Sequence, residues 1–227
     1  MTMNRLVLKC LTSALTLCAA LLGGPVSGAL AATVGAQNDD GVAIIIGNRG
    51  YSDKDIPNVD YAHRDAEAIR RFVKESLGFR DENIIMLKDA TQAQMQSAFG
   101  RQGNHKGWAY QYVRSNRSDL FVFFSGHGVP GIEEGGSFLL PSNADAETAE
   151  INGYPVSLLY HNLGKIQARS VTVFLDACFT GQSHSGPLLK GASGIQVMPR
   201  PEKTDTPMTV ITAATGDQLA SWDEDAK

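Results

Sequence analysis

Five short apolar runs recur along the chain, and each is followed by glycine-rich or polar residues. The runs are rich in Val, Ile and Phe and show little alternation of apolar and polar positions. That pattern is typical of strands buried on both faces of a parallel sheet. The predicted strands cover residues 41–47, 83–87, 119–125, 170–176 and 208–213, with a further short apolar stretch at 137–140.

Segments with helical spacing lie between these runs. Residues 59–77 carry one apolar stripe and predict a helix that Gly78 ends. Further helices are predicted over 91–114, with a break near 100–107, and over 157–167. Strands that alternate with helices predict an α/β fold, a doubly wound and mostly parallel sheet flanked by helices on both faces.

The first residues of the chain differ from the rest. Arg5 and Lys9 give a basic start, an apolar run too short to span a membrane follows, and Ala29-Leu30-Ala31 fits a small-x-small cleavage site. We therefore predict a signal peptide at 1–32 and a short linker at 33–40. The mature protein would be secreted or periplasmic and would keep no stable membrane anchor, a membrane-anchoring segment being the alternative.

Removal of a signal peptide changes two bulk properties. The formal net charge goes from −4 to −6, because Arg5 and Lys9 leave and no acidic residue does. An acidic chain disfavours nucleic acid as a partner and favours basic polypeptides. Cys10 and Cys18 leave as well, so Cys178 is the one remaining thiol. It cannot form an internal disulfide and is either a buried structural residue or one retained for its chemistry.

The strongest candidates for catalytic residues follow the apolar runs at 119–125 and 170–176. The third ends in Ser125-Gly126-His127-Gly128, and the fourth ends in Asp176-Ala177-Cys178-Phe179-Thr180-Gly181. In adjacent parallel strands both loops would open on one edge of the sheet, so His127 and Cys178 would face each other. A thiol attacks as a thiolate and needs such an imidazole partner.

The residues around His127 extend this hypothesis. We expect the two flanking glycines to allow a tight turn, to present the ring to solvent and to let a substrate backbone approach. The backbone N–H groups of Gly128 and Cys178 are candidates for an oxyanion hole. The alternative is that His127 is structural and Cys178 is part of the core.

These motifs resemble the caspase-like superfamily of cysteine peptidases. A strand that ends in S-G-H-G and a second that ends in D-A-C-x-x-G, about 50 residues later, have the spacing of a caspase His and Cys. The cysteine motif is nearer to that of metacaspases and bacterial homologues than to the Q-A-C form of animal caspases. GVAIIIGN, YAHRDAEAI, GFRDENIIMLKDAT, FLLPSNAD and TVITAATGDQLASW extend the resemblance over residues 41–225.

The resemblance implies a caspase-like fold and a cysteine-type endopeptidase that acts on polypeptides through a His127/Cys178 dyad and a thioester acyl-enzyme. Asp65 and Asp176 match the acidic specificity pocket of metacaspases, which implies cleavage after Arg or Lys. Ser221 and Trp222 match the pocket wall. The alternatives are a helix surface charge for Asp65, a strand-end acceptor for Asp176 and a core residue for Trp222.

The resemblance also divides the domain at 41–227. Residues 41–180 correspond to a large subunit, 181–207 to a flexible inter-subunit linker, and 208–227 to the start of a small subunit whose remainder we expect to be missing. Self-cleavage is expected in the linker, where the basic residues are Lys190, Arg200 and Lys203.

No cofactor is expected. Calcium activation, as in some metacaspases, is an alternative, but residues 143–150 lack the spacing of a known calcium loop and are predicted to be a solvated loop. His184 with Cys178 would be half a metal site that no further ligands complete. The same site could instead transfer acyl groups to amines, or the domain could be a binding module without activity. The sequence carries no signal for an oligomeric state.

Overall fold

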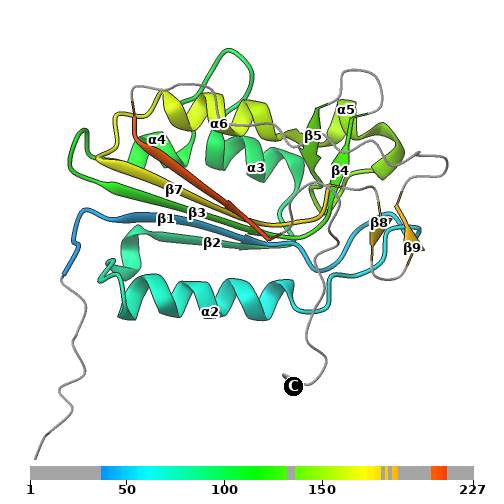
Figure 1. Cartoon of the computed structure of the whole chain (residues 1–227), viewed down its shortest axis with the longest axis horizontal. Coiled ribbons are helices and arrows are strands. Elements are labelled where there is room, and N and C mark those ends of the chain that lie inside the picture. Colours follow the sequence, from blue (N-terminus) through cyan, green and yellow to red (C-terminus); the bar gives the residue numbers. More distant parts are fainter. Residues whose placement is uncertain (1–36, 132–135, 180–181, 184–185, 189–205, 214–227) are drawn as a thin grey trace, which may run out of the picture. The chain divides into compact units, whose positions relative to one another are not determined.

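A five-stranded parallel sheet is the framework of the chain (Figure 1). The computed structural model describes residues 37–131, 136–179, 182–183, 186–188 and 206–213. The sheet has the strand order β10-β7-β3-β1-β2, and every neighbouring pair is parallel. Its strands are β1 (Val42–Gly47), β2 (Ile84–Lys88), β3 (Asp119–Ser125), β7 (Ser170–Asp176) and β10 (Met208–Thr212). Each lies within one residue of a predicted apolar run, so the α/β prediction is confirmed.

Helices cover both faces of this sheet. In Figure 1, α2 (Ala62–Glu75) lies on one face, and α3 (Gln92–Phe99), α4 (Trp108–Tyr112) and α6 (Val156–Gly164) lie on the other. Helix α2 begins three residues later than predicted, because residues 59–61 form a turn in which the Ala62 N–H donates to the Val59 carbonyl. The predicted break between α3 and α4 is present, and Gly100 there has a φ of 89°.

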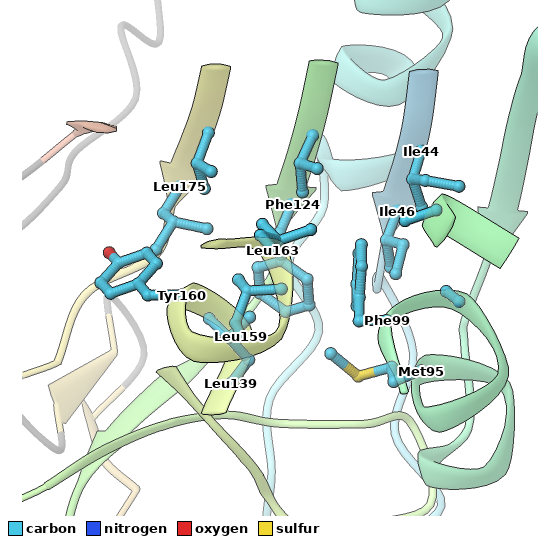
Figure 2. Packing of buried hydrophobic residues seen from close by; sticks show 14 of the residues in the cluster. Ile44, Ile46, Met95, Phe99, Phe124, Leu139, Leu159, Tyr160, Leu163 and Leu175 are labelled. Carbon is cyan, nitrogen blue, oxygen red and sulfur yellow. The ribbon is translucent and has the colours of Figure 1, made fainter. Parts of the chain in front are cut away.

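The strand side chains point alternately to the two faces. Ile44, Ile46, Phe124 and Leu175 pack toward α3 and α6, as Figure 2 shows. Ala43, Ile45, Phe121 and Phe123 pack toward α2. Because both sets are buried, each central strand reads as one continuous apolar run. Full burial of one such aliphatic or aromatic side chain contributes about 1.5–3 kcal/mol, so these two clusters hold the sheet together.

Smaller elements gather near the carboxyl ends of the central strands. β4 (Gly128–Pro130), β5 (Ser137–Leu139) and β6 (Tyr154–Pro155) form an antiparallel sheet. A separate core cluster there includes Tyr51, Val129, Leu140 and Leu188. These elements were missed in the sequence, apart from the stretch at 137–140, because two- and three-residue strands leave no periodic pattern.

One sequence expectation in this region is wrong. Residues 143–150 are not a solvated loop: they contain a 3-10 turn (Ala146–Thr148) and the start of α5 (Ala149–Asn152). Their alanines, Ala144, Ala146 and Ala149, are buried in the same cluster as Tyr51. Within the range predicted as the linker, the structure describes β8 (Gln182–Ser183) and β9 (Gly186–Pro187), which pair with each other.

Several predictions fall outside the described residues. They concern the signal peptide, His184, the linker residues Lys190, Arg200 and Lys203, and the pocket-wall residues Ser221 and Trp222. Within the described part of the chain, no helix is both long enough and apolar enough to cross a membrane.

Candidate active site

The loops after β3 and β7 meet at the carboxyl edge of the sheet. Ser125 and Asp176 are directly paired in the two strands, and the Gly126 N–H donates to the Asp176 carbonyl at 3.2 Å. His127 and Cys178 each lie two residues beyond that pair. A Cβ added to Gly128 would lie 3.0 Å from the Cys178 carbonyl oxygen. The structure therefore brings together the two loops that carry His127 and Cys178.

The His127 side chain is buried and hydrogen-bonded. It is 8% exposed, and its Nε2 lies 2.8 Å from the Pro57 carbonyl oxygen. A carbonyl can only accept, so Nε2 carries the proton and the lone pair of the neutral ring is on Nδ1. Burial lowers the pKa of His127, while the bond to Pro57 raises it by a smaller amount. The ring is thus a neutral base at physiological pH.

This burial corrects the expectation that the His127 ring faces solvent. The flanking glycines serve packing: neither has a positive φ among the described residues. A Cβ on Gly126 would lie 2.9 Å from the Phe124 ring and 3.0 Å from the Tyr51 hydroxyl. A Cβ on Gly128 would lie 2.6 Å from two ring carbons of Phe179. Glycine is needed here because the chain's own side chains occupy the space.

Cys178 lies in the segment that directly follows β7. Its neighbours Ala177 and Phe179 are buried in the main core, whereas Cys178 itself is partly exposed. Within the described part of the chain it forms no disulfide. A partly exposed thiol held between two core residues, beside a loop that carries a neutral imidazole, can act as a nucleophile.

Two carboxylates, Asp65 and Asp176, interact near the end of β7. Asp65 is in the first turn of α2 and Asp176 ends β7, where its Oδ2 accepts a hydrogen bond from the Ser125 hydroxyl at 3.1 Å. Burial raises the pKa of Asp176. Burial and then the Asp176 charge raise the pKa of Asp65, so the two groups lie near enough to repel each other. Two partly buried carboxylates whose pKa values are raised in this way form an environment that favours a bound cation.

Arg64 is a cation that lies beside Asp65. Its guanidinium lies 4.0 Å from Asp65, but its side chain is 57% exposed and lies over the Tyr61 ring. It lowers the pKa of Asp65 less than burial and Asp176 raise it. Arg64 therefore does not reverse the rise in the pKa of Asp65.

Metal ligation has little support in the described residues. Among them, no three His, Cys, Asp or Glu side chains gather closely enough to hold an ion. A cavity of about 860 Å³ is lined by residues of α6 and β5, including His161, and by Lys165; His127 and Cys178 do not line it.

Three residues of this region were not singled out as functional in the sequence. Ser125 stands inside the S-G-H-G motif, and its position opposite Asp176 could have been noted from the strand pairing. Tyr51 and Pro57 contact His127 from a polar segment 76 and 70 residues earlier in the chain. No pattern in the sequence indicates those contacts.

Comparisons with known proteins relate this chain to caspases and metacaspases. The family described as "Caspase domain" matches residues 40–227. Metacaspase-1 of Eremothecium gossypii is 29% identical over 179 residues, which covers 69% of this chain and 37% of that protein. The solved structure of pro-sf-caspase-1 matches 77% of this chain and 57% of its own, with a TM-score of 0.43 and 13% identity.

The chain thus spans less than two thirds of the length of either protein. The match to the caspase domain, in contrast, covers residues 40–227, which is well over half of this chain. The chain therefore belongs to the caspase-domain family of cysteine peptidases.

Proposed function

We propose that this chain is an endopeptidase that cleaves polypeptides after Arg or Lys, with His127 as the base and Cys178 as the nucleophile. The observation that carries the proposal is the register of β3 and β7, in which Ser125 is paired with Asp176 and the two loops leave the sheet side by side. The closeness of the two loops supports it, since a Cβ added to Gly128 would lie 3.0 Å from the Cys178 carbonyl oxygen.

The proposed reaction begins when His127 Nδ1 takes the proton of the Cys178 thiol. Sγ then attacks the scissile carbonyl carbon, and the N–H groups of Gly128 and Cys178 stabilise the oxyanion. The C–N bond breaks, the amine leaves with the proton from Nδ1, and a thioester remains. Water attacks the thioester while Nδ1 takes its proton, and the thiol is regained when the C–S bond breaks. The Pro57 carbonyl keeps Nε2–H in place throughout.

Preference for a basic residue rests on Asp65 and Asp176. An unpaired carboxylate is disfavoured by burial, as the raised pKa of both groups indicates. A guanidinium or ammonium ion between them would relieve both the desolvation and the mutual repulsion. The Ser125 hydroxyl, which donates to Asp176, would fix the orientation of that carboxylate.

Fluorogenic peptides that end in Arg, Lys or Asp test the preference. We expect hydrolysis after Arg and Lys, and a loss of about 100-fold in kcat/KM for Asp176→Asn, the cost of one charged hydrogen-bond partner. Asp65→Asn should lose less, because Asp65 is more exposed. Glu75→Gln is the matched control, since Glu75 is exposed at the far end of the same helix. Preferential hydrolysis after Asp would contradict the proposal.

Acyl transfer and binding without catalysis are the two alternatives to this proposal. Acyl transfer to an amine would appear as aminolysis products when amine nucleophiles are added. A binding module would leave Cys178 unlabelled by an arginyl or lysyl electrophile, such as a fluoromethylketone. Labelling with and without calcium, with Cys178→Ala as a blank, also tests calcium activation.

Self-processing and export complete the proposal. If the enzyme cleaves itself at Lys190, Arg200 or Lys203, the Cys178→Ala variant should remain intact on a gel. The same fragments from that variant would exclude self-processing. N-terminal sequencing of exported protein should begin close to residue 32 if the proposed signal peptide is removed.

A further inference from the structure

A buried tyrosine contacts His127 in two ways. The Tyr51 hydroxyl accepts the His127 backbone N–H at 2.8 Å, and the Tyr51 ring lies 5.2 Å from the imidazole at an angle of 35°. Tyr51 is only 7% exposed, and burial raises the pKa of its phenol, so the hydroxyl stays neutral. Its own proton points to the Asn48 carbonyl at 3.5 Å.

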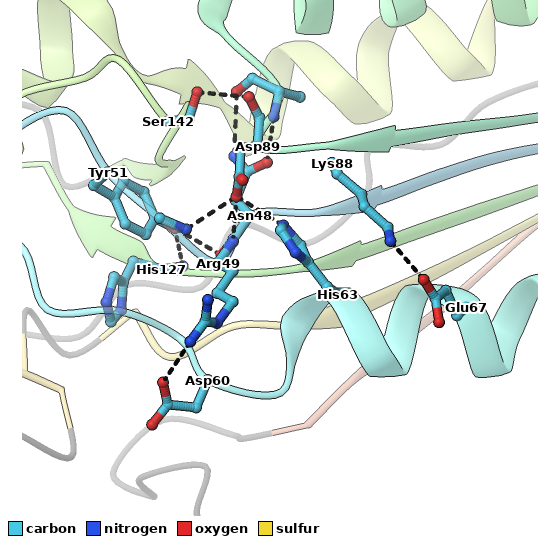
Figure 3. Close-up of polar contacts among 12 residues, drawn as sticks. Asn48, Arg49, Tyr51, Asp60, His63, Glu67, Lys88, Asp89, His127 and Ser142 are labelled. Carbon is cyan, nitrogen blue, oxygen red and sulfur yellow. Dashed lines mark hydrogen bonds and ion pairs between the residues drawn. The ribbon is translucent and has the colours of Figure 1, made fainter.

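The segment that carries Tyr51 is tied to the carboxyl end of β2, as Figure 3 shows. Asp89 Oδ1 accepts the backbone N–H groups of Arg49 and Gly50 at 2.8 and 2.9 Å. The same oxygen lies 2.9 Å from His63 Nε2. Asp89 itself has a φ of 52°, a left-handed conformation that turns its side chain back toward this segment. One carboxylate therefore fixes two consecutive amides just before Tyr51.

A second set of bonds reaches His127 from the same segment. The Asn48 amide donates to the Leu140 carbonyl at 3.0 Å and, more weakly, to the Ala90 carbonyl at 3.3 Å. Leu140 in turn donates its N–H to the His127 carbonyl at 2.9 Å. Residues 48–57 thus hold the backbone of His127 through Tyr51, its ring through Pro57, and its carbonyl through Leu140.

We propose that Tyr51 is a positioning residue for His127, and that the Asp89 carboxylate holds the segment from which Tyr51 reaches it. A general base acts only within hydrogen-bond reach of its proton donor, and a displacement of about 1 Å can lower a rate about 100-fold. Tyr51 fills the space beside Gly126. It also fixes the His127 backbone N–H, which forms no hydrogen bond within a strand pair. The inference rests on the proposed function, in which His127 is the base.

Tyr51→Phe removes the hydroxyl and keeps the ring. We expect kcat for an arginyl substrate to fall about 10- to 100-fold with KM changed by less than about twofold, because the base is displaced and the specificity carboxylates are not. Tyr112→Phe, which removes the hydroxyl of a 45% exposed tyrosine at the end of α4, is the matched control. A loss confined to KM, or an unchanged kcat, would overturn the proposal.

The pH dependence of Cys178 alkylation by iodoacetamide gives a readout that does not need peptidase activity. The alkylated residue is identified by peptide mapping, and denatured protein gives the midpoint of an unperturbed thiol, about pH 8.5. We expect the folded wild-type midpoint to differ from that value and the Tyr51→Phe midpoint to move back toward it by at least about half a pH unit. Coincident profiles of wild type and variant, or of folded and denatured wild type, would refute the role of Tyr51.

This readout separates the two proposals. If the wild-type protein cleaves no peptide, the proposed function fails, while the alkylation midpoints still decide the role of Tyr51. Asp89→Asn tests the anchor and replaces Tyr51→Phe if that variant does not fold. It should lower kcat about 3- to 10-fold and move the midpoint in the same direction. Asp81→Asn, at an exposed ion pair with Arg70, is its control. If folded Asp89→Asn keeps the wild-type kcat and the wild-type pH profile of Cys178 alkylation, Asp89 does not hold the Tyr51 segment in place.

Discussion

Gly128→Ala tests how tightly the two active-site loops are packed together. The added Cβ would lie 2.6 Å from two carbons of the Phe179 ring and 3.0 Å from the Cys178 carbonyl oxygen. Ordinary carbon contacts begin near 3.4 Å, so about 0.8 Å must be taken up by movement. Phe179 is 5% exposed and cannot swing into solvent. The displacement therefore falls on the segment that carries Cys178.

The expected magnitudes follow from that overlap. Overpacking of this kind costs about 1–3 kcal/mol, which lowers Tm by about 2–12 °C in a domain of this size. A shift of close to 1 Å between base and nucleophile lowers kcat about 100-fold. Gly136→Ala is the control, because its Cβ would meet only the Phe138 ring at 3.6 Å.

The assay combines steady-state hydrolysis of an arginyl peptide with thermal unfolding of both variants. Gly128→Ala should lose activity at temperatures well below its Tm, which separates misplacement from unfolding. Gly136→Ala should match the wild type in both measurements. If Gly128→Ala keeps the wild-type kcat and Tm, the close packing of the two loops is refuted. If Gly136→Ala loses as much as Gly128→Ala, the effect is not specific to the contact between these loops.

The remaining predictions concern pH and buried polar groups. A hydrogen bond from Arg169 is the main cause that lowers the pKa of Asp119 from 3.8 to about 2, so Asp119 stabilises the fold above pH about 4, and this contribution disappears as pH falls toward 2. Because Arg169 is 57% exposed, we expect Asp119→Asn to lose about 1 kcal/mol in urea unfolding at pH 7; an equal loss at pH 2 would contradict this. Burial lowers the pKa of His127, so the acid limb of kcat/KM should lie below pH 6.5, and a limb above that value would contradict the neutral ring. Asn48→Ala leaves three buried backbone groups without their partner and should cost about 2–4 kcal/mol in urea unfolding, whereas the exposed control Asn58→Ala should cost less than about 0.5 kcal/mol.

The sheet was predicted well because its strands carry their own signal. β3 and β7 agree with the apolar runs at both ends. β3 is buried on both faces after its first residue, whereas β7 is buried on one face and partly buried on the other. Helix α2 was predicted three residues too long at its start, because the apolar stripe continues through a turn that only hydrogen bonds distinguish from a helix. The stretch at 143–150 was predicted to be a loop because its acidic residues indicate exposure to solvent, although the alanines between them are buried.

The amino-acid sequence alone was enough to predict the parallel sheet and to place His127 and Cys178 at the ends of two strands. Apolar runs and short motifs are local features, and the strand edge follows from them. The burial of His127, the bond from its ring to Pro57 and the contact with Tyr51 were decided only by the tertiary structure. Those partners lie 70 and 76 residues away in the sequence, and packing around the sheet edge, rather than any local pattern, brings them to the imidazole.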